Sequence, residues 1–215
     1  MERNFQRSLS LVLKHEGGWS DHPDDPGGAT MKGVTLANFR RYVKPSATKA
    51  DLRNITDDQL ATVYRRFYWD AVAGSELPDG VDYAVFDFAV NSGPNRAAKY
   101  LQAVVGAPQD GRIGPATLKA VRAKMLATVI HDLCDKRMAF LKGLKTWKTF
   151  GKGWSRRVTD VRSEALKMTA PQSTTPKPIE TSVSSPKPEA QSTAPAKVNW
   201  LVKLLQALAA LFKRK

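Results

Sequence analysis

Three features that this chain lacks limit what it can be. Cys134 is the single cysteine in 215 residues, so an intramolecular disulfide framework is excluded, and its apolar surroundings predict a buried structural thiol. The first 18 residues carry charges up to Arg7 and have no small-residue cleavage site, which argues against a secretory signal peptide. The apolar run 200–212 has 13 residues, too few for a bilayer span of roughly 20.

Acidic side chains are scarce in the second half of the chain. Residues 1–96 hold 12 basic and 13 acidic side chains, residues 97–170 hold 15 and 5, and residues 171–215 hold 7 and 2. The formal net charge of +14 therefore comes from the second half. A basic surface favours a polyanionic partner, which can be nucleic acid, an anionic membrane or a bacterial envelope. Charge alone does not choose among these.

Aromatic side chains are missing from residues 170–197. This segment has 6 prolines and 9 serines or threonines in 28 residues, so it cannot bury a core and is predicted to be a disordered linker. In residues 198–215, which follow, the large apolar side chains repeat at helical spacing on one face. This last segment is predicted to be a basic amphipathic helix.

Alternating strand patterns are also lacking, and the fold class predicted is mainly α. Thr56 and Gln59 are spaced as a capping box, and the segment 27–35 suggests a short β-hairpin. Four stretches show apolar residues at helical spacing: 55–69, 80–93, 115–144 and 153–168.

What the sequence does contain is a glutamate at the end of an apolar helical run, in LVLKHEGGWS (11–20). Glu16 projects onto the apolar face of that run, and Gly17 and Gly18 can end the helix directly after it through a left-handed cap. Burial and the negative end of the helix dipole would both raise the pKa of the Glu16 carboxyl. A carboxylic acid that keeps its proton near neutral pH can act as a general acid.

The following loop supplies complementary groups. Asp21, Asp24 and Asp25 lie in a polar segment with prolines and glycines, where at least one carboxylate should stay ionised, and the Thr30 hydroxyl can hold a water. One protonated acid beside one carboxylate is the pair required for glycosidic bond cleavage. The residues alone are equally compatible with an ordinary helix-end glutamate followed by a solvated turn.

The stretch EGGWSDHPDDPGGATMKGVT (16–35) resembles the signature of glycoside hydrolase family 108, the peptidoglycan muramidases of phage, prophage and secretion clusters. Further similarity lies in YRRFYWD (64–70), VFDFAVNSGP (85–94) and FGKGWSRRV (150–158). The spacing of the acidic residues is also similar to that of small phage lysozymes. LQAVVGAPQDGRIGPATLKAV (101–121) resembles the turn of peptidoglycan-binding modules, although its Asp-Gly turn and helix-starting proline can be purely structural.

The resemblance implies a lysozyme-like helical fold with a short β-hairpin or loop at the active site. It implies four segments: a catalytic domain (1–95), a helical peptidoglycan-binding-type module packed on it (96–169), the disordered linker (170–197) and the amphipathic helix (198–215).

The resemblance also implies site residues. Glu16 would be the general acid, and Asp25, helped by Thr30, would orient water or stabilise the transition state. Asp87 and Asn91 would line the cleft, with Tyr64 and Trp69 as further substrate-binding candidates for which a place in the core is the stronger alternative. No metal and no cofactor is predicted, because His15 and His22 beside the acid are weak support for a metal site.

The function expected on these grounds is a monomeric N-acetylmuramidase that acts on peptidoglycan in the periplasm or cell wall after synthesis in the cytoplasm. Two alternatives stay open. A catalytically silent wall-binding or envelope-binding protein would use the basic half alone, and a nucleic-acid-binding protein would leave the Glu16 loop unexplained and has no recognised motif here. The helix 198–215 is expected to contact an anionic membrane or outer envelope, or else to dock on the protein itself.

Overall fold

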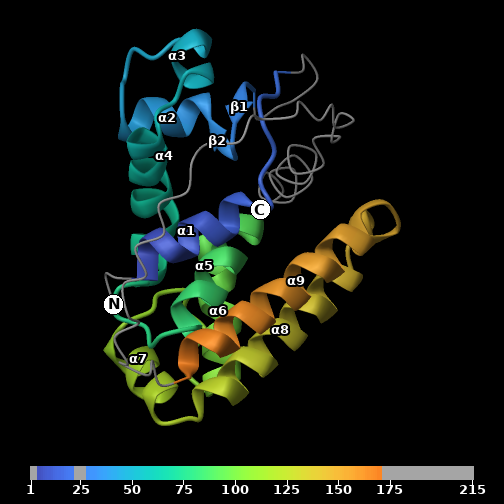
Figure 1. Cartoon of the computed structure of the whole chain (residues 1–215). Coiled ribbons are helices and arrows are strands. Elements are labelled where there is room, and N and C mark those ends of the chain that lie inside the picture. Colours follow the sequence, from blue (N-terminus) through green and yellow to red (C-terminus); the bar gives the residue numbers. More distant parts are fainter. Residues whose placement is uncertain (1–3, 22–27, 171–215) are drawn as a thin grey trace, which may run out of the picture.

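The computed structural model describes residues 4–21 and 28–170, and this part of the chain is mainly helical, as predicted. The helices are α1 (Asn4–Leu13), α2 (Leu36–Tyr42), α3 (Lys49–Arg53), α4 (Asp57–Tyr64), the π-helix η1 (Arg65–Trp69), the 3-10 helix η2 (Asp70–Val72), α5 (Val81–Ser92), α6 (Pro94–Val105), α7 (Pro115–Arg122), α8 (Leu126–Lys142) and α9 (Trp147–Thr169). Figure 1 shows α2, α3 and α4 with the small sheet at one end, and the long antiparallel pair α8 and α9 at the other. Between them lie α1 and α5.

The predicted hairpin is confirmed. Strands β1 (Thr30–Met31) and β2 (Val34–Thr35) pair antiparallel, with Met31 opposite Val34. The turn residues Lys32 and Gly33 both have positive φ, 47° and 77°, as a two-residue turn that follows the strand twist requires.

Helix α1 ends earlier than expected. Its last residue is Leu13, and the next two backbone bonds, His15 N to Val12 O and Glu16 N to Leu13 O, close tight three-residue turns. Neither Gly17 nor Gly18 has a positive φ, so the predicted left-handed cap is wrong. The helix stops three residues short of Glu16, and the Glu16 carboxyl accepts from an arginine of α9 instead of lying along the face of α1.

Helix α5 is the centre of the fold. All of its 12 residues are buried, and it packs against α1, α6, α8 and α9. It ends at Gly93, as predicted, where φ is 92°. The capping box at the start of α4 is also confirmed, since the Thr56 hydroxyl accepts from Gln59 N and the Gln59 side chain accepts from Thr56 N.

The long helix predicted over 115–144 is two helices. Helix α7 ends at Arg122, and α8 begins at Leu126 after an extended residue, Met125, whose side chain is 76% exposed. The break is explained by packing, because α7 lies on α6 while α8 lies along α9, α6 and α5. One straight helix could not bury both apolar stripes.

The turn after α6 is held by one buried amide. The Gln102 side chain donates to Asp110 Oδ1 at 2.7 Å and accepts from Gly111 N at 2.9 Å. Gly111 has a φ of 81°. These bonds explain the Asp-Gly turn of this segment by local structure alone.

A single hydrophobic core runs through the described residues, from Phe5 in α1 to Met168 in α9. Residues before and after the predicted boundary at 95/96 contribute to it, and the division into two modules stays a prediction. Among the described helices, none is long and apolar enough to cross a membrane. Most of the predicted linker and all of the helix 198–215 lie outside the described residues.

Candidate active site

Glu16 is a buried acid between α1 and the hairpin. Its side chain is only 1% exposed, and its Oε1 accepts a hydrogen bond from Arg157 Nη1 of α9 at 3.0 Å. Its Oε2 is buried and has no hydrogen-bond partner among the described residues. One carboxyl oxygen is therefore anchored, and the other is buried with no group of the described residues to satisfy it.

Arg157 belongs to a buried charge cluster, which we define as Glu16, Asp87, Arg137 and Arg157. Asp87 of α5 accepts from Arg157 Nε at 3.0 and 3.1 Å and from Arg137 Nη1 at 2.7 Å. All four side chains are at most 2% exposed. Two carboxyls thus face two guanidinium groups in a space closed to water, where ion pairs are screened little.

The two carboxyls of the cluster have opposite pKa shifts. Burial raises the pKa of Glu16, and the charge and hydrogen bond of Arg157 offset this only in part. Burial would also raise the pKa of Asp87, but Arg157 and Arg137 outweigh it and bring the pKa to about 2. Asp87 therefore holds a permanent charge that is shared with both arginines, while Glu16 is the carboxyl that can keep a proton.

The hairpin turn lies against Glu16. A Cβ on Gly33 would come within 2.9 Å of Glu16 Oε2 and would collide with the Tyr64 hydroxyl. Tyr64 is fully buried, and its hydroxyl donates to Lys32 O at 2.9 Å. This hydrogen bond fixes the turn from the core side. Only glycine fits at residue 33, because φ is positive there and the backbone approaches the acid closely.

The remaining predicted catalytic residues belong to the hairpin and the loop before it. Thr30 of β1 is 3% exposed, and its hydroxyl donates to Gly28 O at 3.2 Å. Asp25 lies outside the described residues, as do Asp24 and His22. The roles of Thr30 and Asp25 stay predictions.

The predicted substrate-binding residues are all buried. Trp69 is 0% exposed, packs edge-on against Phe86 with ring centroids 5.3 Å apart, and donates from its indole nitrogen to Ser75 Oγ at 2.9 Å. These contacts place Trp69 in the core. Asp87 is bonded to the two arginines and Tyr64 to Lys32 O, as described above. A substrate contact for Trp69, Asp87 or Tyr64 stays a prediction.

Asn91 differs from those three because it has a free donor. It lies one turn after Asp87 on α5, is 1% exposed, and accepts from Ser92 Oγ at 3.0 Å. Its side-chain nitrogen is buried without a hydrogen-bond partner among the described residues. Such a donor is available to a carbonyl or hydroxyl oxygen of a ligand.

Sequence reasoning missed Arg157, Arg137 and Gly33. Arg157 is 141 residues from Glu16, and the motif that contains it carried no signal for an ion pair at that distance. Gly33 could have been singled out, because a lysine-glycine pair between two short strands is a turn that needs positive φ. In the part of the chain that the structure describes, no three His, Cys, Asp or Glu side chains are grouped as a metal site would require.

The fold and the site together define a class: a helical protein with a buried carboxylic acid beside a short β-hairpin, suited to acid-catalysed bond cleavage. Residues 9–93 match the family Glycosyl hydrolase 108. A solved structure titled "Structure of Brucella abortus SagA" is 48% identical, has a TM-score of 0.70, and aligns with 79% of this chain and 97% of its own. A search of curated proteins found no match.

The chain therefore belongs to the glycosyl hydrolase 108 family. It is a glycoside hydrolase, and its substrate is a carbohydrate. The family predicted from the sequence motifs is confirmed.

Proposed function

We propose that this protein is an N-acetylmuramidase, which hydrolyses the β-1,4 bond between N-acetylmuramic acid and N-acetylglucosamine in peptidoglycan. The observation that carries the proposal is Glu16, a buried carboxyl with a raised pKa, one anchored oxygen and one oxygen without a hydrogen-bond partner among the described residues. Family membership supplies the reaction type. The sequence similarity of residues 16–35 to muramidases indicates which glycosidic bond is cleaved.

In the proposed reaction Glu16 donates its proton to the glycosidic oxygen as the bond from the anomeric carbon to that oxygen breaks. Asp25, helped by Thr30, either orients the attacking water and takes its proton or stabilises the oxocarbenium-like transition state. A separation of roughly 6.5–9.5 Å between the Glu16 and Asp25 carboxyls would favour inversion, and about 5–5.5 Å retention.

The buried charge cluster supports this role of Glu16. Arg157 holds Oε1 and so directs Oε2 toward the hairpin side. Because Asp87 takes most of the charge of Arg157, through two hydrogen bonds and a 2.8 Å contact from Nη2, Glu16 is not forced to ionise. Arg157 and Asp87 are therefore positioning residues in this proposal.

Mass spectrometry of the soluble fragments tests the function. Purified peptidoglycan digested by the protein should give fragments that end in reducing N-acetylmuramic acid. Reducing N-acetylglucosamine would instead identify a glucosaminidase. No fragments at all would favour the silent wall-binding protein, which the basic charge of residues 97–170 would suit.

Asp25→Asn should lower the rate of peptidoglycan hydrolysis by roughly 10²-fold, because the amide orients water poorly and cannot accept its proton. The rate is followed as the fall in turbidity of a peptidoglycan suspension. Asp24→Asn is the matched control and should retain most of the activity. A larger loss for Asp24→Asn than for Asp25→Asn would exchange the two assignments.

We also propose that the protein is monomeric, acts in the periplasm or cell wall, and uses residues 198–215 to contact an anionic membrane or outer envelope. Deleting residues 171–215 should spare hydrolysis of purified peptidoglycan and weaken binding to anionic lipid vesicles at least about tenfold at low salt. Each lysine or arginine near such a surface contributes about 1 kcal/mol to the free energy of binding. Added salt screens this electrostatic contribution. Equal vesicle binding by both proteins would leave the basic surface of residues 97–170 as the contact.

A further inference from the structure

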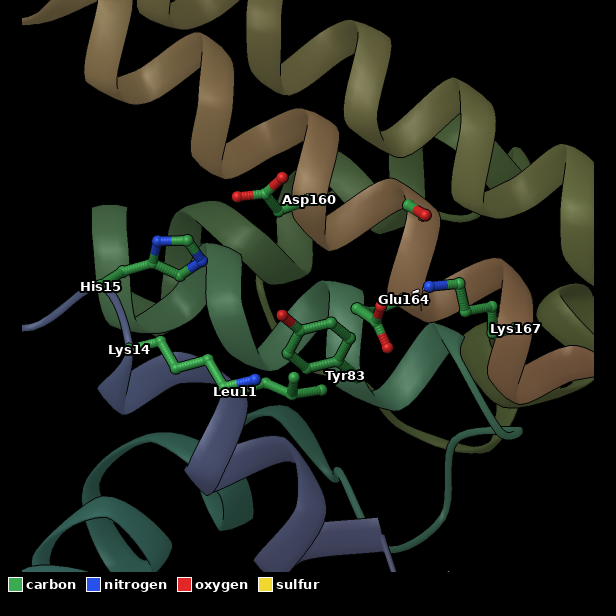
Figure 2. Close-up of a pocket in the computed structure, with 8 residues that line it drawn as sticks. Leu11, Lys14, His15, Tyr83, Asp160, Glu164 and Lys167 are labelled. Atoms are coloured by element: carbon green, nitrogen blue, oxygen red, sulfur yellow. Dashed lines mark hydrogen bonds and ion pairs between the residues drawn. The ribbon is translucent and has the colours of Figure 1, made fainter.

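A pocket lies where α1 and the turn after it meet α5 and α9, and the proposed mechanism does not use it. Its volume is about 470 Å³, within the range of small-ligand sites. Figure 2 shows its lining side chains converging from α1, from the turn after it, and from α5 and α9. They are Leu11, Lys14, His15, Tyr83, Asp160, Ser163, Glu164 and Lys167.

Tyr83 provides a polar group inside the pocket. Its side chain is only 1% exposed, and in Figure 2 its hydroxyl points into the open space of the pocket. No described residue forms a hydrogen bond with this hydroxyl. Burial and the charge of Asp87 raise the pKa of Tyr83, so the hydroxyl stays protonated and can donate. This hydroxyl is therefore free to donate to a ligand or to water in the pocket.

One end of the pocket carries an excess of positive charge. Glu164 is paired with Lys167 at 2.6 Å and with Arg7 at 3.9 Å. Lys14 lies near enough for its charge to help lower the pKa of Glu164, after the hydrogen bond and charge of Lys167 and the charge of Arg7. Among the lining residues, Lys14 and Lys167 against Glu164 leave a net charge of +1 at this end, which suits a carboxylate.

The other end carries a free negative charge. In Figure 2 Asp160 lies on the side of the pocket next to His15, and no dashed line joins it to another residue drawn. Its charge acts on the His15 imidazole. Burial, followed by the charge of Arg157, lowers the pKa of His15, so the imidazole is neutral at neutral pH and does not neutralise Asp160. The aspartate is therefore available to a cation.

We propose that this pocket binds a zwitterionic α-amino carboxylate, with its carboxylate at Lys14 and Lys167, its ammonium group at Asp160, and the Tyr83 hydroxyl as a hydrogen-bond donor between them. The arrangement of opposite charges at the two ends selects a ligand that carries both. An anion alone would be repelled by Asp160, and a cation alone by the lysines.

The source we assign is the free end of a diamino acid in a peptidoglycan stem peptide, an assignment that rests on the proposed function. In a stem that is not cross-linked, this end presents an ammonium group and a carboxylate on one carbon. The pocket borders the buried charge cluster, because His15 precedes Glu16 and Asp160 lies one turn after Arg157 on α9. Binding there would let the protein recognise the peptide as well as the sugar.

The test measures binding separately from hydrolysis. Full-length protein carrying Glu16→Gln is titrated by NMR with the tripeptide L-Ala-γ-D-Glu-meso-diaminopimelate, then with the same peptide N-acetylated or amidated at its diamino acid end. We expect the unmodified peptide to bind best. Adding Asp160→Asn or Lys14→Met should weaken its binding at least about fivefold, the effect of one exposed ion pair. The matched exposed controls Asp132→Asn and Lys119→Met should leave it unchanged.

Equal affinity for the three peptides, or no loss with either pocket variant, would overturn the inference. Free diaminopimelate is the final probe. Weaker binding of the free amino acid than of the tripeptide supports the stem as the source, whereas equal binding overturns that source. Because every titration uses Glu16→Gln, a failure of the wild-type protein to cleave peptidoglycan would count against the proposed function alone.

Discussion

Glu16→Gln is expected to reduce peptidoglycan hydrolysis by at least about 10²-fold, because an amide keeps the shape of the acid but cannot donate its proton. Arg157 can still donate to the amide oxygen, so the fold should be retained. The measurement is the initial rate of turbidity loss at fixed protein concentration, with unfolding in urea to confirm that stability is kept. Residual activity above a few per cent of wild type would place the acid elsewhere.

The matched control for this experiment is Glu76→Gln, which changes an exposed glutamate and should leave the rate unaltered. The pH profile offers a second readout. A general acid works only while it is protonated, so the wild-type rate should fall as pH rises through the raised pKa of Glu16. A rate that instead rises steadily through this range would contradict the assignment.

Asp87→Asn should destabilise the protein by roughly 3–5 kcal/mol, because it leaves two buried arginines facing one fewer negative charge. The measurement is the free energy of unfolding in urea at pH 7. Asp132→Asn, which changes an exposed aspartate, is the matched control and should shift this free energy by less than about 0.5 kcal/mol. A similarly small shift for Asp87→Asn would show that the cluster adds little to stability.

The lowered pKa of Asp87 predicts how the stability of the wild-type protein depends on pH. Its pKa of about 2 in the folded protein lies below the unfolded value of about 4, so its contribution is fully present above about pH 4. That contribution, about 2 kcal/mol, should be lost as pH falls from about 4 to about 2. The free energy of unfolding of Asp87→Asn should therefore fall less over this acidic range than that of wild type. An identical fall in both proteins would contradict the pKa shift.

Local patterns in the sequence predicted much of the fold. The capping box at Thr56, the central apolar helix that ends at Gly93 and the hairpin at residues 30–35 were predictable because each depends on residues close together in the chain. The predicted burial of Glu16 is also confirmed, although the residue lies beyond the end of α1 rather than on its apolar face. These features follow from backbone preferences and side-chain periodicity, which a short stretch of sequence contains.

The two errors in helix boundaries have a common cause. The end of α1 at Leu13 and the break between α7 and α8 both depend on what the helices pack against. Periodicity shows which face is apolar, but it does not show that the next segment must turn to reach a different partner. Tertiary packing decides such boundaries.

The sequence by itself determined the helical class, the family, the hairpin and the burial of Glu16. Only the tertiary structure decided which side chains surround that acid: Arg157 from 141 residues away, Asp87 between two arginines, and Gly33 at the closest approach of the hairpin. Ion pairs in a buried space depend on distances of a few ångströms between helices that are far apart in the chain. No residue spacing encodes these distances, and so the raised pKa of Glu16 and the lowered pKa of Asp87 emerge only when the helices pack.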